Sequence, residues 1–124
     1  MSAMSEGSYG PGDVFWAPDP YNDTTDGPRP WLVLAADNLP FAGEEYVCAA
    51  LTLSDHASNL AVDDSWIVGG NPEQTSYCSP WVLATVKHDA VANPQGKVTA
   101  EFTERVVRET TGYLPGDLGV ELGT

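Results

Sequence analysis

The stretch DGPRPWLVLAADN, which runs from Asp26 to Asn38, places an arginine between two prolines directly before the strongest apolar run of the chain. The run Trp31 to Ala35 has five consecutive apolar residues, which is typical of a strand that is buried on both faces or twisted through a barrel. The segment before it, PDPYNDTTDGPRP, has four prolines among other turn-forming residues. We therefore expect a polar, proline-rich loop that leads Arg29 into a central strand.

Short apolar runs on both sides of this strand are separated by Pro, Gly, Asn and Asp, as in a protein built from short strands. We expect strands at Asp13 to Ala17, Tyr46 to Leu53, SWIVGG (65–70) and YCSPWVLATVK (77–87). Because proline cannot donate to a strand ladder, Pro80 indicates an edge or a bulge in the last of these. The expected fold class is mainly β, a small antiparallel barrel, since closure removes exposed strand edges.

The hydrophobic period changes near the C-terminal end of the chain. In VTAEFTERVVRETTGYLP (98–115), Phe102 and Val106 are four residues apart, which is helical spacing. Thr99 is a suitable N-cap, and Gly112 with the proline three residues later is a stop signal. The pattern predicts one C-terminal helix.

With 124 residues, the chain has the length of one domain. We expect a flexible N-terminal segment over residues 1–11, a single domain over 12–114 and a flexible acidic tail over 115–124. No segment approaches the roughly 20 apolar residues of a membrane helix, and MSAMSEGSYG lacks the basic flank and apolar stretch of a signal peptide. We therefore expect a soluble, cytoplasmic protein with no membrane partner. In that compartment Cys48 and Cys78 are more often free thiols than a disulfide, although a disulfide stays open.

The charge balance is strongly acidic, since 18 Asp and Glu residues oppose 5 Lys and Arg, for a formal net charge of -13. Disordered chains share such a balance, but four Trp, five Tyr and three Phe within strand patterns favour a folded core. An acidic, lysine-poor surface on a folded domain is typical of proteins kept soluble in concentrated salt, where charge repulsion is screened over about 3 Å at 1 M. A salt-adapted, halophilic source is therefore our hypothesis.

Three motifs occur in a specific order and spacing. They are GDVFW (12–16), GPRPWLVL (27–34) and VCAALT (47–52), and the expected helix follows them. In this arrangement, from Gly12 to Leu114, the chain resembles the MazF/PemK family of toxin ribonucleases, within the wider Kid/CcdB superfamily. The resemblance implies an SH3-like barrel with a C-terminal helix, a homodimer, cleavage of single-stranded RNA without a metal or other cofactor, and control by a cognate antitoxin protein.

The same resemblance implies that Arg29 and Thr52 are the catalytic pair, with Gly27, Pro28 and Pro30 supporting the site. RNA carries its own nucleophile, the ribose 2′-OH, so the enzyme needs only to position the strand and stabilise the charge that develops at the phosphate. Arginine is a planar, permanently charged donor that suits phosphate, and flanking prolines fix the backbone from which it projects. A threonine hydroxyl at a strand end near that loop would donate to the same phosphate.

Three further residues are candidates for proton transfer or RNA contact. His56 lies in the loop after Thr52, and imidazole exchanges protons near neutral pH, although a loop histidine without a role is the plainer interpretation. Lys87 and His88 follow an expected strand and would either touch an RNA backbone or form a solvated turn. Aromatic residues at strand positions are more often core, but a base-stacking platform among them stays open. These residues are Phe15, Trp16, Trp31, Trp66 and Trp81.

Two positions differ from many members of the family. Thr24, Thr25 and Asp26 stand where those members carry an acidic residue or a Glu-Gln pair, and Ala84 and Thr85 stand where they carry an Asp-Gln pair. Two other functions therefore remain open. One is a non-catalytic barrel that binds nucleic acid or a protein, and the other is a CcdB-like inhibitor of a protein target such as gyrase.

The acidic surface predicts that stability depends on salt. Dilution of potassium chloride from molar to millimolar concentration is expected to unfold the domain, because repulsion among the acidic side chains is then no longer screened. Far-ultraviolet circular dichroism across the dilution series measures the loss of structure. Full secondary structure at low salt would contradict the hypothesis of salt adaptation.

Overall fold

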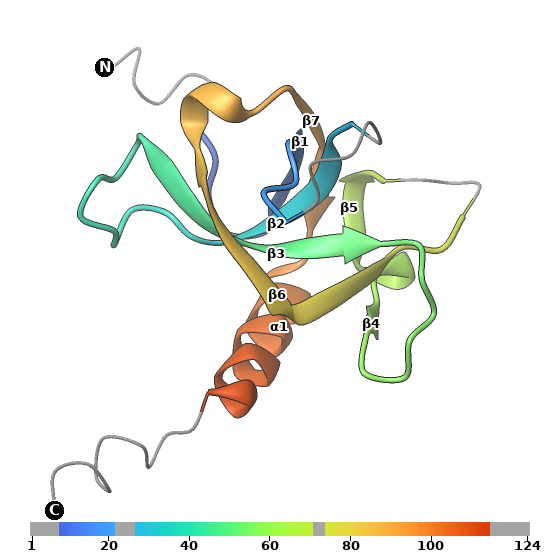
Figure 1. Cartoon of the computed structure of the whole chain (residues 1–124). Coiled ribbons are helices and arrows are strands. Elements are labelled where there is room, and N and C mark those ends of the chain that lie inside the picture. The colour runs from blue at the N-terminus through green and yellow to red at the C-terminus, as the bar shows by residue number, and fades with distance from the viewer. Residues whose placement is uncertain (1–7, 22–26, 71–73, 115–124) are drawn as a thin grey trace, which may run out of the picture.

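The structure, a computed structural model, describes residues 8–21, 27–70 and 74–114. Within these residues the chain forms seven strands, two short 3-10 helices and one α-helix (Figure 1). Their bounds are β1 Asp13–Ala17, β2 Arg29–Ala35, β3 Glu45–Thr52, β4 Leu60–Ala61, η1 Asp63–Ser65, β5 Trp66–Gly69, β6 Tyr77–Lys87, η2 His88–Ala90, β7 Asn93–Val98 and α1 Ala100–Tyr113. None of the helices in these described ranges is long and apolar enough to span a membrane.

The strands pair antiparallel in one sheet, in the order β4-β6-β3-β2-β1-β7-β5. The sheet curls into a half-barrel, and α1 packs against β6 (Figure 1). The mainly β fold, with a small barrel followed by a C-terminal helix, is therefore confirmed.

An interruption in the long strand β6 helps to bend the sheet. Ala49 of β3 pairs with Leu83, whereas the next residue, Ala50, pairs with Ser79. The residues of β6 between these two partners, beginning with Pro80, have no partner on β3. This is the bulge that the proline predicted, and a bulge increases the local twist that lets a sheet curl.

Both faces of the central strand β2 are buried. Leu32 packs in one hydrophobic cluster with Phe102 and Val106 of α1, whereas Trp31 and Val33 pack in a second cluster. Successive side chains of a strand point to opposite faces, so the continuous apolar run supplies both clusters at once. The prediction of a strand buried on both faces is confirmed.

The helix begins where the sequence predicted. The hydroxyl of Thr99 accepts a hydrogen bond of 3.1 Å from the backbone N–H of Phe102, which satisfies one of the open donors of the first turn. The predicted end of the helix is confirmed, because α1 ends at Tyr113 with Leu114 as its C-cap, between the two residues of the stop signal. A glycine inside a helix costs about 1 kcal/mol relative to alanine and is tolerated. The second part of the stop signal, Pro115, lies outside the described residues.

Cys48 and Cys78 are both buried, and both are free thiols. They belong to different hydrophobic clusters, so no disulfide joins the strands that carry them. Apolar surroundings disfavour a thiolate, and burial accordingly raises the pKa of Cys78 from 9.0 to about 12 and raises the pKa of Cys48 even more strongly.

These raised pKa values predict inert thiols and a loss of stability in alkali. Near pH 8 the native protein should react slowly with a thiol reagent such as DTNB, and denaturant should expose both thiols. Above the ordinary pKa of 9.0 the unfolded chain loses thiol protons that the folded chain keeps, so stability falls as pH rises. Timed thiol titration and denaturant unfolding over this pH range measure both effects. Rapid labelling of the native protein would contradict the burial.

Candidate active site

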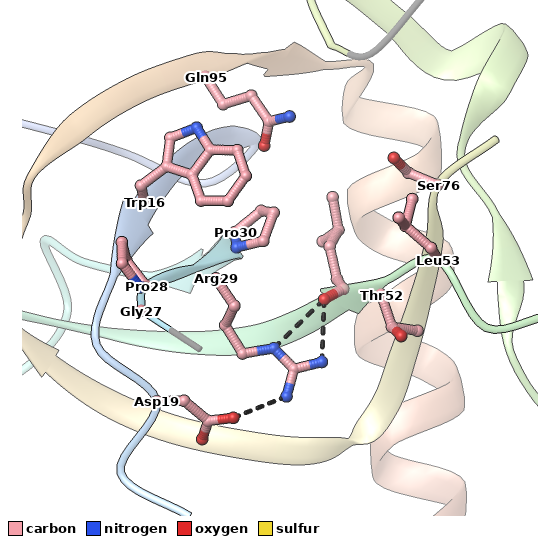
Figure 2. A pocket seen from close by; sticks show the side chains of 11 residues that line it. Trp16, Asp19, Gly27, Pro28, Arg29, Pro30, Thr52, Leu53, Ser76 and Gln95 are labelled. Atoms are coloured by element: carbon pink, nitrogen blue, oxygen red, sulfur yellow. Dashed lines mark hydrogen bonds and ion pairs between the residues drawn. The ribbon is translucent and has the colours of Figure 1, made fainter. Parts of the chain in front are cut away.

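A cavity of about 370 Å³ lies where the ends of β1, β2 and β3 approach β7 (Figure 2). Arg29 and Thr52, the two residues predicted to be catalytic, both line this cavity. So do the three residues predicted to support them, which are Gly27, Pro28 and Pro30. The structure thus brings together, in one cavity, residues that lie far apart in the sequence.

Strand pairing explains why Arg29 and Thr52 are close. Ala17, at the end of β1, pairs with Arg29 at the start of β2, and Trp31 pairs with Ala50 of β3. In an antiparallel pair the two strands advance together in opposite directions. Counting two residues back from Trp31 and two residues forward from Ala50 therefore brings Arg29 opposite Thr52, the last residue of β3.

Three hydrogen bonds to the protein hold the guanidinium of Arg29 (Figure 2). Nε and Nη2 donate to the carbonyl oxygen of Leu51 over 3.3 and 3.0 Å, and Nη1 donates to the carboxylate of Asp19 over 2.9 Å. A guanidinium has five N–H donors, and the described residues take up three of them, which leaves two without an acceptor among these residues. The Arg29 side chain is 29% exposed and lines the cavity.

Asp19 is a site residue that sequence reasoning missed. Its side chain is only 10% exposed, and its charge offsets part of the charge of Arg29. The sequence does contain a signal, because Asp19 stands between Pro18 and Pro20 just as the arginine stands between two prolines. The two Pro-X-Pro segments fix the backbones from which the two opposite charges project.

Thr52 is partly exposed at the end of β3, on the cavity wall. Its Oγ1 accepts a hydrogen bond of 3.2 Å from the backbone N–H of Ser54. A hydroxyl that accepts in this way still has its own hydrogen to donate. Arg29 and Thr52 can therefore offer donors to one anionic group.

Trp16, Ser76 and Gln95 also line the cavity. Trp16 is half-buried and lines the cavity, so it is the aromatic residue best placed to stack on a base there. Phe15 and Trp31, by contrast, are fully buried in the core. Sequence reasoning did not identify Ser76 or Gln95, because no local pattern distinguishes either residue.

His56 lies elsewhere. It is exposed, and its ring packs against Trp81 with 5.7 Å between the ring centroids. Both residues line a second cavity of about 470 Å³, beside Tyr113 at the end of α1. The structure does not bring His56 into the cavity of Arg29.

Lys87 and His88 also lie away from this cavity. Lys87 pairs with Glu45 at the first residue of β3, at the opposite end from Thr52. The Lys87 ammonium forms an ion pair of 3.1 Å with Glu45, and Nδ1 of His88 lies 2.7 Å from the hydroxyl of Tyr46. Neither residue lines the cavity of Arg29, so neither is placed for proton transfer there.

The positions that differ from the MazF/PemK pattern are only partly described. Thr24, Thr25 and Asp26 lie outside the described residues. Ala84 and Thr85 lie within β6, opposite Cys48 and Val47 of β3, and neither lines the cavity of Arg29.

Comparison with known proteins gives matches in structure only. No family model matches the sequence, and no curated protein matches it. Among solved structures, an endoribonuclease in complex with its cognate antitoxin from a mycobacterial species has a TM-score of 0.63 at 19% identity, over 87% of this chain and 98% of that chain. A second mycobacterial endoribonuclease has a TM-score of 0.58 at 17% identity, over 85% and 89%. The Mycobacterium tuberculosis toxin MazF-mt6 has a TM-score of 0.55 at 22% identity, over 81% and 92%.

The chain has the MazF fold. The resemblance found in the sequence motifs is thereby confirmed for the architecture, including the barrel and the C-terminal helix. Within the MazF fold, the cavity that contains Arg29 and Thr52 is the candidate active site of this chain.

The ion pair between Arg29 and Asp19 is expected to stabilise the fold as well as the site. Asp19→Ala should lower the free energy of unfolding by about 1–3 kcal/mol, because it leaves one arginine N–H of a half-buried side chain without its acceptor. Glu45→Ala is the matched control, since it removes the partner of the exposed Lys87 and should cost about 0–1 kcal/mol. Denaturant unfolding at one fixed salt concentration compares the two variants. Equal costs would mean that Asp19 adds little to the positioning of Arg29.

Proposed function

We propose that this protein is the toxin of a type II toxin-antitoxin system, an endoribonuclease that cleaves single-stranded messenger RNA without a metal ion. One observation carries the proposal: Arg29 and Thr52 meet in a single cavity on a fold shared with endoribonucleases. Among the described residues, two N–H donors of Arg29 and the hydroxyl hydrogen of Thr52 have no acceptor. Two converging donors, one of them cationic, suit a phosphate oxygen.

The reaction proposed here uses a nucleophile that RNA itself supplies. The 2′-oxygen attacks the neighbouring phosphorus as it loses its proton, and the bond to the 5′-oxygen of the next nucleotide breaks. That oxygen takes up a proton, with water carrying protons between the two sites. The products end in a 2′,3′-cyclic phosphate and a 5′-hydroxyl. Negative charge develops on the phosphate oxygens, and donors already fixed in position stabilise it most effectively.

The two amino acids would share this work unequally. The two free N–H groups of Arg29 would hold the phosphate by charge and direction, while Leu51 and Asp19 keep the guanidinium from moving. Thr52 would add one neutral hydrogen bond. Arginine remains protonated at neutral pH, so its role is electrostatic and not proton transfer.

The partners belong to the proposal as well. One solved structure with this fold is an endoribonuclease in complex with its cognate antitoxin, and we infer that a cognate antitoxin controls this chain by covering the Arg29 cavity. We further propose a homodimer, which the resemblance to the MazF/PemK family implies, and a cytoplasmic location.

A second candidate function, a non-catalytic binding barrel, is favoured by one observation. Three of the five donors of Arg29 are already used within the protein, as they would be if the arginine only joined Asp19 to the end of β3. In that case Arg29→Ala would lower stability without removing any activity.

Cleavage of a long, unstructured RNA in molar potassium chloride and a metal chelator decides between these functions. The wild-type protein should cut, leaving cyclic phosphate ends. Arg29→Ala and Thr52→Val should each lower the rate by about 10²- to 10³-fold, the usual cost of removing a donor to a developing oxyanion. Arg105→Ala, which removes an exposed arginine of α1, is the matched control and should cut normally. Circular dichroism confirms that each variant is folded.

Failure of the folded wild-type protein to cut a wide set of sequences would overturn the proposal. Equal cleavage by all four proteins would place the chemistry at another site.

A further inference from the structure

Gln95 lies on the cavity wall with an unsatisfied polar atom. Its Oε1 is buried, and no described residue donates a hydrogen bond to it. A buried acceptor without a partner costs roughly 1–3 kcal/mol, and such groups are rare in folded proteins. A side-chain oxygen of this kind, in a residue that lines a cavity, can serve to accept a hydrogen bond from a ligand.

A strand irregularity directs this side chain. On β1, Val14 pairs with Gly96 of β7, whereas the next residue, Phe15, pairs with Pro94. Gln95 is therefore the extra residue of a β-bulge and has no partner on β1. Bulges often occur beside functional sites, where they turn a side chain in a new direction.

The neighbouring strand β5 fixes the backbone of Gln95. Gly70 donates its N–H to the carbonyl oxygen of Gln95 over 3.1 Å. A Cβ atom on Gly69 would lie 2.1 Å from the same oxygen, so glycine is needed for this close approach. The amide group is thus presented to the cavity from a firmly held backbone.

Trp16 provides a flat surface in the same part of the cavity. Figure 2 shows its ring and the amide of Gln95 together on one wall, with the guanidinium of Arg29 further along the cavity. The pairing of β1 with β7 places these two residues on adjacent strands. A volume of about 370 Å³ is within the usual range for small-ligand sites and suits one nucleotide.

We propose that Trp16 and Gln95 form a nucleobase-binding subsite. The base stacks on the Trp16 ring and donates an amino or ring N–H to Oε1 of Gln95, while the Gln95 amide N–H₂ can donate to an adjacent acceptor of the base. The phosphate of the same nucleotide unit lies at Arg29. This inference rests on the proposed function, because it assigns a base of the RNA substrate to the same cavity.

Binding of small probes tests the subsite without any need for cleavage. The four nucleoside 3′-monophosphates and ribose 5-phosphate are titrated by calorimetry in molar potassium chloride. The wild-type protein should bind at least one nucleotide about ten-fold more tightly than ribose 5-phosphate, the gain of one specific hydrogen-bonded and stacked base. Gln95→Met should lose the part of this gain that the hydrogen bond supplies and should bind ribose 5-phosphate as before.

Two further variants separate a binding role from a structural one. Trp16→Leu should weaken all four nucleotides toward the affinity of ribose 5-phosphate, because the stacking surface for the base is lost. Gln74→Met, which changes an exposed glutamine outside the cavity, should bind like the wild type. Gln95→Met should keep or raise the melting temperature, because it removes a buried acceptor that lacks a donor.

The outcomes are distinct for the two proposals. No preference for nucleotides over ribose 5-phosphate in the wild type, or an unchanged preference in Gln95→Met, overturns the subsite. A lower melting temperature for Gln95→Met also overturns it, since Gln95 would then be structural. If RNA is cut and Gln95→Met cuts at the same sequences and rates, the subsite fails while the ribonuclease function stands. Nucleotide binding that depends on Gln95, without RNA cleavage, supports the subsite and refutes the ribonuclease function.

Discussion

The contact between the guanidinium of Arg29 and the carbonyl oxygen of Leu51 joins β2 to β3 at the cavity. It exists because the register of these two strands places the start of one beside the end of the other. Asp19 completes the junction from the segment after β1. Three separate parts of the chain are therefore held in one arrangement by one cation. Any ligand of Arg29 meets a group whose position is already fixed, which lowers the entropic cost of binding.

The two ends of the cavity differ in how their polar groups are satisfied. Around Arg29 the charge is partly neutralised and most donors are used, so this end contributes to stability. Around Gln95 a buried acceptor has no donor among the described residues, so this end lowers stability. Binding groups that are unfavourable in the free protein are a common cost of function. The bulge in β7 sets the direction of the Gln95 side chain. In a regular strand, where successive side chains alternate between the two faces, this side chain would point in another direction.

Much of the fold could be predicted from local sequence patterns. The apolar run after Arg29, the bulge at Pro80 and the cap at Thr99 each depend on residues close together in the chain. The site was only partly predictable. Arg29 and Thr52 stand within recognisable motifs, whereas Gln95 becomes important only through a register shift between β1 and β7, and no local pattern encodes that shift. His56 follows Thr52 closely in sequence, but the loop after β3 carries it to a different cavity.

The distribution of charge constrains how this protein would recognise RNA. The chain has only five Lys and Arg, and among the described residues Arg29, Lys87 and Lys97 already form ion pairs with carboxylates. Nucleic-acid binding by many basic contacts, which depends on counterion release, is therefore weak here. Phosphate contacts of that kind position a strand but do not read its sequence. With so little general attraction, affinity must come from short-range contacts inside the cavity, so the contribution of each base contact to specificity is correspondingly large. We therefore expect high salt to favour RNA binding here, because it screens the repulsion between RNA and the acidic surface, whereas few cationic contacts are available for it to weaken.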